Sequence, residues 1–285
     1  MNEDPLGAYK ETLAKFELLC EEVLGRSIQK SGQEDSREIY GIQVYSKISM
    51  HALAIQKILP HSRYNQDMEK QIWDLGSLPV LIRALFQAYY HFFYIMLDDD
   101  PEYDFDFKIE ILDYHSEKER LRMLESIYRK STKTDEVKNM IDEVNERIDE
   151  KKIELVDNPL SKKLKKKDNV LYCLIMNGVR YAVKTDKELS KNANISKWYC
   201  STMQKYLSQY VHTTPFSVKE IFVFRHLEDG DPSAFIVMLK HAINYLAFSI
   251  RDFAKYFGLD IADEIRDIIV ESEARVQMFS PEQGA

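Results

Sequence analysis

Apolar residues dominate one stretch of the chain, residues 78–97, whose sequence LPVLIRALFQAYYHFFYIML is almost continuously apolar or aromatic. A helix that is apolar on nearly every side has to be surrounded by the rest of the fold. We therefore expect this stretch to form a buried central helix. Polar side chains recur inside it at three- and four-residue steps, which places them on one side of that helix: Arg83, Gln87, Tyr90, His91 and Tyr94.

Apolar positions at helical spacing predict further helices before and after this stretch. The expected ranges are 8–30, 38–59, 67–75, 105–130, 134–155, 185–191, 197–212, 234–257 and 260–278. Residues 171–183 form a short apolar segment, for which we expect a helix, with a strand as the alternative. The pattern as a whole predicts a mostly α fold, a multi-helix bundle around the central helix.

Composition favours the same fold class. The 285 residues include only 9 glycines and 8 prolines, and 45% of them are hydrophobic, so few positions would interrupt long helices. We expect residues 1–285 to form a single helical domain. Within it, the ranges 105–130 and 134–155 predict an outer helical hairpin over residues 105–157, followed by a basic loop over residues 158–169.

Charge narrows the function classes. The formal net charge is −8 and the sequence pI is about 5.5, which argues against a generally basic, nucleic-acid-coating protein but not against a local basic patch. The strongest local patch is a run of five lysines between Lys162 and Lys167. Such a run is either a solvated face or a set of phosphate contacts, and both alternatives remain open at this point.

Cysteine usage and the lack of a signal-peptide pattern lead us to expect a cytoplasmic protein. Cys20, Cys173 and Cys200 are odd in number, far apart and without a CxxC pair, which argues against a disulfide framework or a zinc knuckle. The N-terminus lacks the basic and apolar regions of a signal peptide. Residues 78–97 are long enough to cross a bilayer, but a central Arg83 costs about 2.5–3.5 kcal/mol on membrane insertion. We expect no membrane association.

One face of the helix expected over residues 197–212 carries candidate chemistry. Ser201, Lys205, Ser208 and His212 follow one another at steps of four, three and four residues, so they share that face. His212 falls at the helix C-terminus, where the helix dipole favours an imidazolium. It is a candidate acid or base, and a capping or surface histidine is the alternative.

Arg83 is the second candidate, because a guanidinium inside an apolar helix needs a partner. Asp74 is the nearest carboxylate before the helix and the expected structural partner. Arg83 and Asp74 then form a structural ion pair, or Arg83 and His212 together form an anion site. The sequence contains no Gly-rich phosphate loop, HExxH, GxSxG or EF-hand pattern, and we expect neither cofactor nor metal.

Two sequence patterns carry a family resemblance. Asp74-x-x-Ser77-x-x-x-Leu81-x-Arg83-x-Leu85-x-Gln87-Ala88 and the later run over residues 206–212, YLSQYVH, resemble a large, mostly helical bacterial family of unknown function. Members of that family have Arg followed four residues later by Glu, and a Leu-Ser-x-x-Val-His signature. Gln87 stands in the place of that Glu, which removes a negative charge from any site that the two patterns share.

A second resemblance concerns Lys205-x6-His212, which is similar to the Arg-x4-to-6-His motif of HEPN domains. Those helical folds act in toxin–antitoxin and phage-defence systems as metal-independent ribonucleases, generally as dimers. The resemblance implies that His212 is the general acid or base and that Lys205 stabilises the scissile phosphate. Lys205 replaces the motif's Arg and lacks its bidentate fork, and Tyr206 follows where the motif often has another polar residue.

Two function classes follow. The first is a HEPN-like protein that binds or cleaves RNA, with Arg83, Gln87, His91, Tyr206 and Ser208 as further anion- or substrate-binding candidates beside His212 and Lys205. The second is a non-catalytic helical module that binds a partner protein or a small anion. A homodimer is compatible with both.

Overall fold

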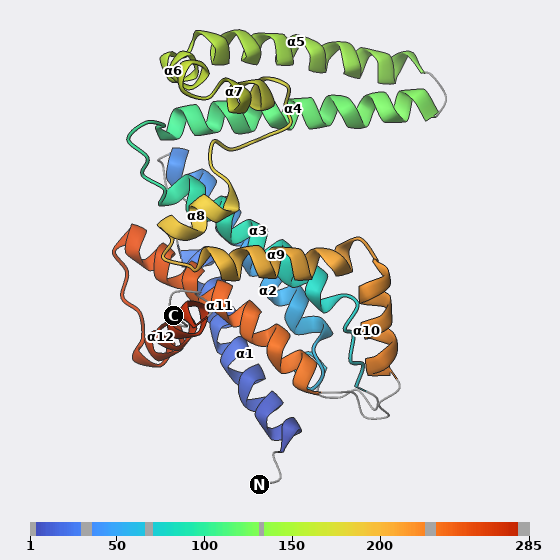
Figure 1. The fold of residues 1–285 in the computed structure, drawn as a ribbon, viewed down its shortest axis with the longest axis vertical. Coiled ribbons are helices and arrows are strands. Elements are labelled where there is room, and N and C mark those ends of the chain that lie inside the picture. Colours follow the sequence, from blue (N-terminus) through green and yellow to red (C-terminus); the bar gives the residue numbers. More distant parts are fainter. Residues whose placement is uncertain (1–3, 30–35, 66–70, 131–133, 226–231, 279–285) are drawn as a thin grey trace. The chain divides into compact units, whose positions relative to one another are not determined.

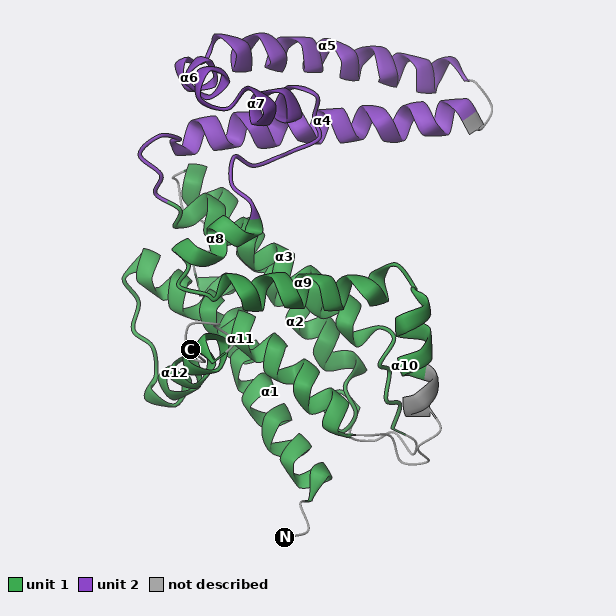
Figure 2. Cartoon of the chain, in the orientation of Figure 1, with its two compact units in different colours: residues 1–98, 186–285 green, residues 99–185 purple. Residues whose placement is uncertain are grey.

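The computed structural model describes residues 4–29, 36–65, 71–130, 134–225 and 232–278. Within these ranges every regular element is a helix, twelve in all, and no strand occurs. The chain divides into two compact units: unit 1 combines residues 1–98 with residues 186–285, and unit 2 is residues 99–185 (Figure 2). The mostly α fold class predicted from the sequence is confirmed.

Unit 1 contains eight helices (Figure 1). They are α1 (Pro5–Gln29), α2 (Ser36–Ile58), α3 (Leu78–Met96), α8 (Asp186–Asn192), α9 (Lys197–Val211), α10 (Pro215–Arg225), α11 (Pro232–Phe257) and α12 (Asp263–Gln277). Helix α3 packs against α2, α8, α9 and α11, while α1 lies along α11 and α2. The stretch predicted as a buried central helix therefore occupies that place.

Local residues explain where helix α3 begins. Pro79 lies in the first turn, where a missing N–H costs nothing, and the Ser77 side chain makes no capping bond. The capping carboxylate is Asp74, whose Oδ1 accepts a hydrogen bond from the Ser77 backbone N at 2.9 Å. Close packing continues along α3: a side chain on Gly41 of α2 would collide with Met96. Glycine at residue 41 thus permits the approach of the two helices.

Helix α11 is the second core element, and every residue from 241 to 250 is buried. Among the described residues it is the helix that is long and apolar enough to cross a membrane. Burial inside the fold covers 72% of its most apolar window, as in the core helix of a soluble protein. The sequence predicted a helix over residues 234–257 but named residues 78–97 as the buried central helix, so α11 is a second buried helix of the core.

Unit 2 is built on a helical hairpin of α4 (Phe105–Lys130) and α5 (Asp135–Asp157), with α6 (Pro159–Lys167) and α7 (Asn169–Met176) following α5. The Tyr114 hydroxyl of α4 donates a hydrogen bond to Met176 O at 2.7 Å and so ties the end of α7 to the hairpin. Residues 171–176, for which a strand was an alternative, are helical.

The basic loop expected over residues 158–169 is wrong, because most of this segment forms α6. Asn158 Oδ1 accepts a hydrogen bond from Leu160 N at 2.8 Å, and Pro159 fits the first turn, so the pair starts a helix where it had been read as a break. The lysines that follow are good helix formers. Leu164, which is 1% exposed, anchors α6 to its neighbours.

Candidate functional site at the end of helix α9

Helix α9 separates a buried face from an exposed one. Ser196 caps its start by accepting a hydrogen bond from Tyr199 N at 3.4 Å. The buried face consists of Tyr199, Cys200, Met203, Leu207 and Tyr210. Lys205 and His212 are exposed on the other side. The amphipathic pattern read from the sequence thus determines which residues of α9 can meet a ligand.

Helix α9 packs against α3, and contacts near its two ends indicate that the two helices run in opposite directions. Near its start, Asn192 Nδ2 donates a hydrogen bond to Asp98 Oδ1, which follows the end of α3, at 2.7 Å. Beyond its end, Ile221 of α10 lies beside Gly76, which precedes α3. The C-terminal turn of α9 therefore lies at the end of unit 1 where α3 begins.

Arg83 belongs to this same half of α3. Its guanidinium carbon lies 4.8 Å from the centre of the Phe86 ring, a cation–π contact on its own helix. Gln87, one turn later, is exposed. Asp74 caps the start of α3 through the Ser77 N–H. Its pairing with Arg83 stays a prediction.

His91 lies toward α2 and in the opposite half of α3. Its Nε2 is 3.1 Å from the Tyr40 hydroxyl, and the two rings stack at 5.9 Å. Burial, together with the charge of Lys47, lowers the pKa of His91 to about 4, so the ring is neutral near pH 7. The polar residues predicted to share one side of α3, between residues 83 and 94, therefore contact different neighbours. Tyr90 is buried, with 2% of its surface exposed.

Tyr206 and Ser208 are both held by local hydrogen bonds. The Ser208 hydroxyl donates to Gln204 O of its own helix at 2.6 Å. The Tyr206 hydroxyl donates to Glu220 Oε2 of α10 at 3.2 Å, and Tyr210 donates to the same oxygen. Burial, followed by the bond to Glu220, raises the pKa of Tyr210 well above its ordinary value. This carboxylate clamps α10 to α9, and only Tyr206 of the three was a sequence candidate.

Lys205 and His212 are placed differently. Both are exposed, and within the described ranges neither side chain takes part in a hydrogen bond or an ion pair. They are seven positions apart, which turns the helix almost twice and brings both to one face, with a rise of about 10.5 Å between their Cα atoms. The two groups thus present an accessible cation and an accessible imidazole along one line.

The backbone directly after His212 is unusual. Thr214 N bonds to Gln209 O at 3.1 Å and Thr213 N bonds to Tyr210 O at 3.2 Å, the pair of bonds that ends a helix in a Schellman motif. In this motif the residue after the helix cap adopts the left-handed conformation, and glycine is usual there. Here that residue is Thr213, with φ 48°. A β-branched residue in that conformation is strained by about 1–3 kcal/mol. Strain of this kind clusters at functional sites.

A buried polar network supports the other side of α9. The Tyr199 hydroxyl lies 2.8 Å from His241 Nδ1 and accepts a hydrogen bond from Asn244 Nδ2 at 2.9 Å. Arg275 NH1 donates to Asn244 Oδ1 at 2.6 Å. Burial lowers the pKa of His241 to about 4, with a smaller contribution from Arg275. His241 is therefore neutral near pH 7 and has a structural place, which its position in an apolar helix did not reveal.

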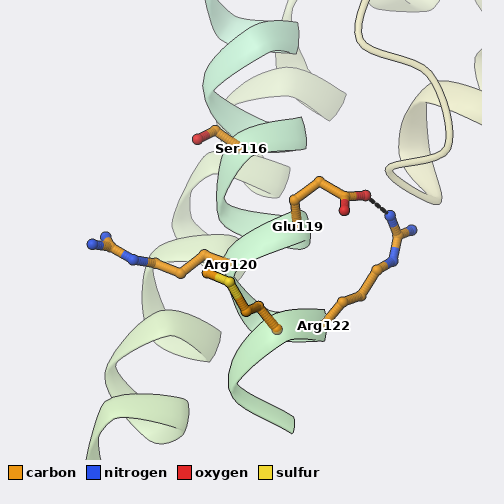
Figure 3. Close-up of a pocket in the computed structure, with 5 residues that line it drawn as sticks. Ser116, Glu119, Arg120 and Arg122 are labelled. Atoms are coloured by element: carbon orange, nitrogen blue, oxygen red, sulfur yellow. Dashed lines mark hydrogen bonds and ion pairs between the residues drawn. The ribbon is translucent and has the colours of Figure 1, made fainter. Parts of the chain in front are cut away.

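The remaining candidate groups lie elsewhere. No cluster of three or more metal-ligating side chains occurs among the residues that the structure describes. Unit 2 has an open depression on α4 lined by Ser116, Glu119, Arg120, Arg122 and Met123 (Figure 3). Arg122 pairs there with Glu119 and also donates to Gly178 O at 3.0 Å. None of the sequence candidates lines this depression.

Comparison with known families identifies the chain. Residues 39–231 match the family described as "Family of unknown function (DUF5677)". The chain belongs to this family. The match covers more than half of the chain, including α3, α9 and all of unit 2, and it confirms the resemblance to an uncharacterised, mostly helical family. Curated proteins and solved structures give no match.

Proposed function

We propose that the end of helix α9 binds RNA and cleaves it without a metal ion, with His212 as the general acid or base. The observation that carries the proposal is the pair Lys205 and His212, exposed on one face and not engaged by any described residue. A group that is neither buried nor bonded contributes little to stability, so its chemistry is available to a ligand. The strained Thr213 beside His212 supports the same location.

The chemistry of metal-independent cleavage requires one group that moves a proton. The ribose 2′-oxygen attacks the adjacent phosphorus, the bond from phosphorus to the 5′-oxygen breaks, and a 2′,3′-cyclic phosphate and a 5′-hydroxyl result. His212 either takes the proton from the 2′-hydroxyl or gives one to the departing 5′-oxygen, and water completes the exchange. A loss of His212 should therefore lower turnover by about 10²–10⁴-fold.

Lys205 binds the RNA backbone in this scheme. The side chains of one helix lean in the same direction, so the separation of about 10.5 Å in rise between the two Cα atoms is kept, and the ammonium meets a phosphate next to the scissile one more readily than the scissile one itself. Phe216 of α10, 44% exposed and in edge contact with Tyr206 at 6.1 Å, offers a face on which a base can stack.

The test is incubation of purified protein with mixed RNAs in EDTA, at several pH values, alongside three variants. We expect His212→Ala to lower turnover by about 10²–10⁴-fold and Lys205→Ala to raise KM more than it lowers kcat. Lys197→Ala is the matched control, because Lys197 is an exposed lysine on the first turn of the same helix. Intact RNA with the wild-type protein contradicts the proposal, and cleavage by His212→Ala at the wild-type rate contradicts the assignment of the site.

A second candidate function is a non-catalytic module that binds a partner protein. Three exposed apolar side chains close to His212 in the sequence favour it: Val211 at 44%, Phe216 at 44% and Val218 at 50%. Apolar residues gathered on a surface are typical of an interface. In this case RNA leaves the NMR signals of His212 and Phe216 unchanged, whereas the first proposal requires RNA to shift both.

A further inference from the structure

Helix α7 is apolar without being buried. Every residue of α7 after Asn169 is apolar or aromatic, yet its buried residue is Ile175. Val170 is 71% exposed and Leu174 is 37% exposed, and Cys173 is exposed between them. Spacings of three and four residues place these three side chains on one side of the helix. Beyond α7, Val179 is also exposed, at 60%.

Helix α6, which packs against α7, is basic. It carries five lysines, and its buried residues are Ser161 and Leu164. Lys163 and Lys167 pair with Glu102, and Lys162 pairs with Asp157, all three lysines with side chains that are more than half exposed. Exposed pairs of this kind bind weakly and leave much of the positive field in place.

The two remaining lysines, Lys165 and Lys166, make no ion pair with a described residue. Lys165 Nζ lies 5.2 Å from the centre of the Tyr172 ring, so a lysine of α6 directly overlies α7. Lys166 is exposed and has no ion pair or hydrogen bond among the residues described. Helix α6 ends at Lys167 and Val170 lies in the first turn of α7, so exposed lysines and exposed apolar side chains are adjacent along the chain.

We propose that the pair α6–α7 docks on the surface of an anionic lipid bilayer. Val170 and Leu174 enter the boundary between headgroups and acyl chains, and the lysines of α6 contact the headgroup phosphates. Charge complementarity selects a lipid surface, since the lysines attract anions while the exposed side chains of α7 are aliphatic and need an apolar phase. RNA offers phosphates but stacks on aromatic rings and gives aliphatic side chains nothing to enter.

This docking is peripheral and differs from a membrane span. The expectation of no membrane rested on residues 78–97, which lie in the core as α3. Helix α7 is a separate, shorter apolar segment, which the sequence predicted as a helix or a strand. The proposal concerns unit 2 and is independent of the proposed RNA cleavage by α9.

Cys173 provides a direct probe, because Cys20 and Cys200 are buried and Cys173 alone is exposed among the three. A thiol-reactive, environment-sensitive fluorophore on Cys173 should shift its emission to shorter wavelength with vesicles of phosphatidylcholine and phosphatidylglycerol. Vesicles of phosphatidylcholine alone should leave the emission unchanged. Unlabelled protein should sediment with the mixed vesicles and be released by high salt.

Variants separate the two contributions. We expect Val170→Asp and the double variant Lys165→Glu/Lys166→Glu each to weaken vesicle binding about tenfold or more. Lys152→Glu on α5 is the matched control and should bind as the wild type does, since Lys152 is an exposed lysine outside the patch. Circular dichroism checks that each variant is folded.

Three outcomes overturn the proposal. One is equal binding to neutral and anionic vesicles, or binding to neither. Another is an emission shift that RNA causes and anionic vesicles do not. The third is a shift that grows with protein concentration in the absence of lipid, which would mean that a second copy of the chain covers α7.

Discussion

Polar groups on helix α11 and polar groups at the end of helix α9 have opposite surroundings within the same unit. On α11, Asp252 is 3% exposed, accepts a hydrogen bond from the Tyr89 hydroxyl at 2.8 Å, and accepts another from Arg251 Nε at 2.8 Å. At the end of α9, Lys205 and His212 are exposed, and no described residue bonds to their side chains.

This difference distinguishes polar residues that stabilise the fold from polar residues whose side chains are available to a ligand. A buried carboxylate with several partners cannot be removed without leaving those partners unsatisfied. An exposed side chain without partners can be removed at little cost to stability. Substitutions in the two places should therefore affect different measurements, stability for α11 and ligand chemistry for α9.

The largest stability effect should come from Asp252→Ala. The change leaves the buried Tyr89 hydroxyl without its acceptor and removes one of the two carboxylates that face Arg251, the other being Glu273 at 2.8 Å. We expect a loss of about 3–5 kcal/mol in the free energy of unfolding. Denaturant titration measures it, and a loss below about 1 kcal/mol would show that Asp252 is not a structural anchor.

Acid should weaken the α11 network through His241. Its folded-state pKa is about 4 against 6.5 for an ordinary histidine, so the unfolded chain binds the proton more tightly. The stabilisation is complete above pH 6.5 and is lost as the pH falls toward 4, by about 3 kcal/mol in all.

The variant His241→Gln isolates this contribution, because glutamine keeps an acceptor for the Tyr199 hydroxyl. Between pH 6.5 and pH 4 the unfolding free energy of the variant should fall less steeply than that of the wild type, by about 1.4 kcal/mol per pH unit. His91 titrates in the same window in both proteins. Equal slopes would contradict a neutral, buried His241.

A smaller effect should appear at the two helix ends. Helix α11 also ends in a left-handed residue, Gly258 with φ 62°, and Leu259 N bonds to Ala254 O at 2.9 Å. Helix α9 uses Thr213 in the corresponding place. Thr213→Gly should raise the free energy of unfolding by about 0.5–1 kcal/mol, the relief of strain less the entropy that glycine loses on folding.

Function should respond to Thr213→Gly in the opposite direction. If the strained residue fixes the orientation of His212, cleavage should fall although stability rises. Gly258→Ala is the comparison at the α11 end and should destabilise the protein by about 1–2 kcal/mol without a specific effect on cleavage. A stabilised Thr213→Gly protein with full activity would assign the strain no role in the site.

The sequence was informative where periodicity alone decides the outcome. Residues 78–97 are apolar on nearly all sides, and α3 is buried accordingly. The sequence was less informative about α6. The lysines after Asn158 and Pro159 predicted a solvated loop, although lysine has a high helix propensity. The buried state of α3 follows from its composition, whereas the exposed state of α7 depends on what the other helices leave uncovered.

The candidate site shows the same division. Lys205 and His212 were found from spacing on one helix, and the structure leaves them on one exposed face. Tyr210 and Glu220 were missed, since their bond joins α9 to α10 and no local pattern predicts it. The polar residues of α3 do not form one site, because successive turns of the helix pack against different neighbouring helices. His91, for example, contacts Tyr40 of α2.

The most direct test of the division between α11 and α9 is to measure unfolding and RNA cleavage on one preparation of His212→Ala. We predict a free energy of unfolding within about 0.5 kcal/mol of the wild-type value and a turnover in EDTA that is lower by about 10²–10⁴-fold. A variant that loses stability and activity together, or that retains full activity, would contradict the assignment of the α9 end as the functional site.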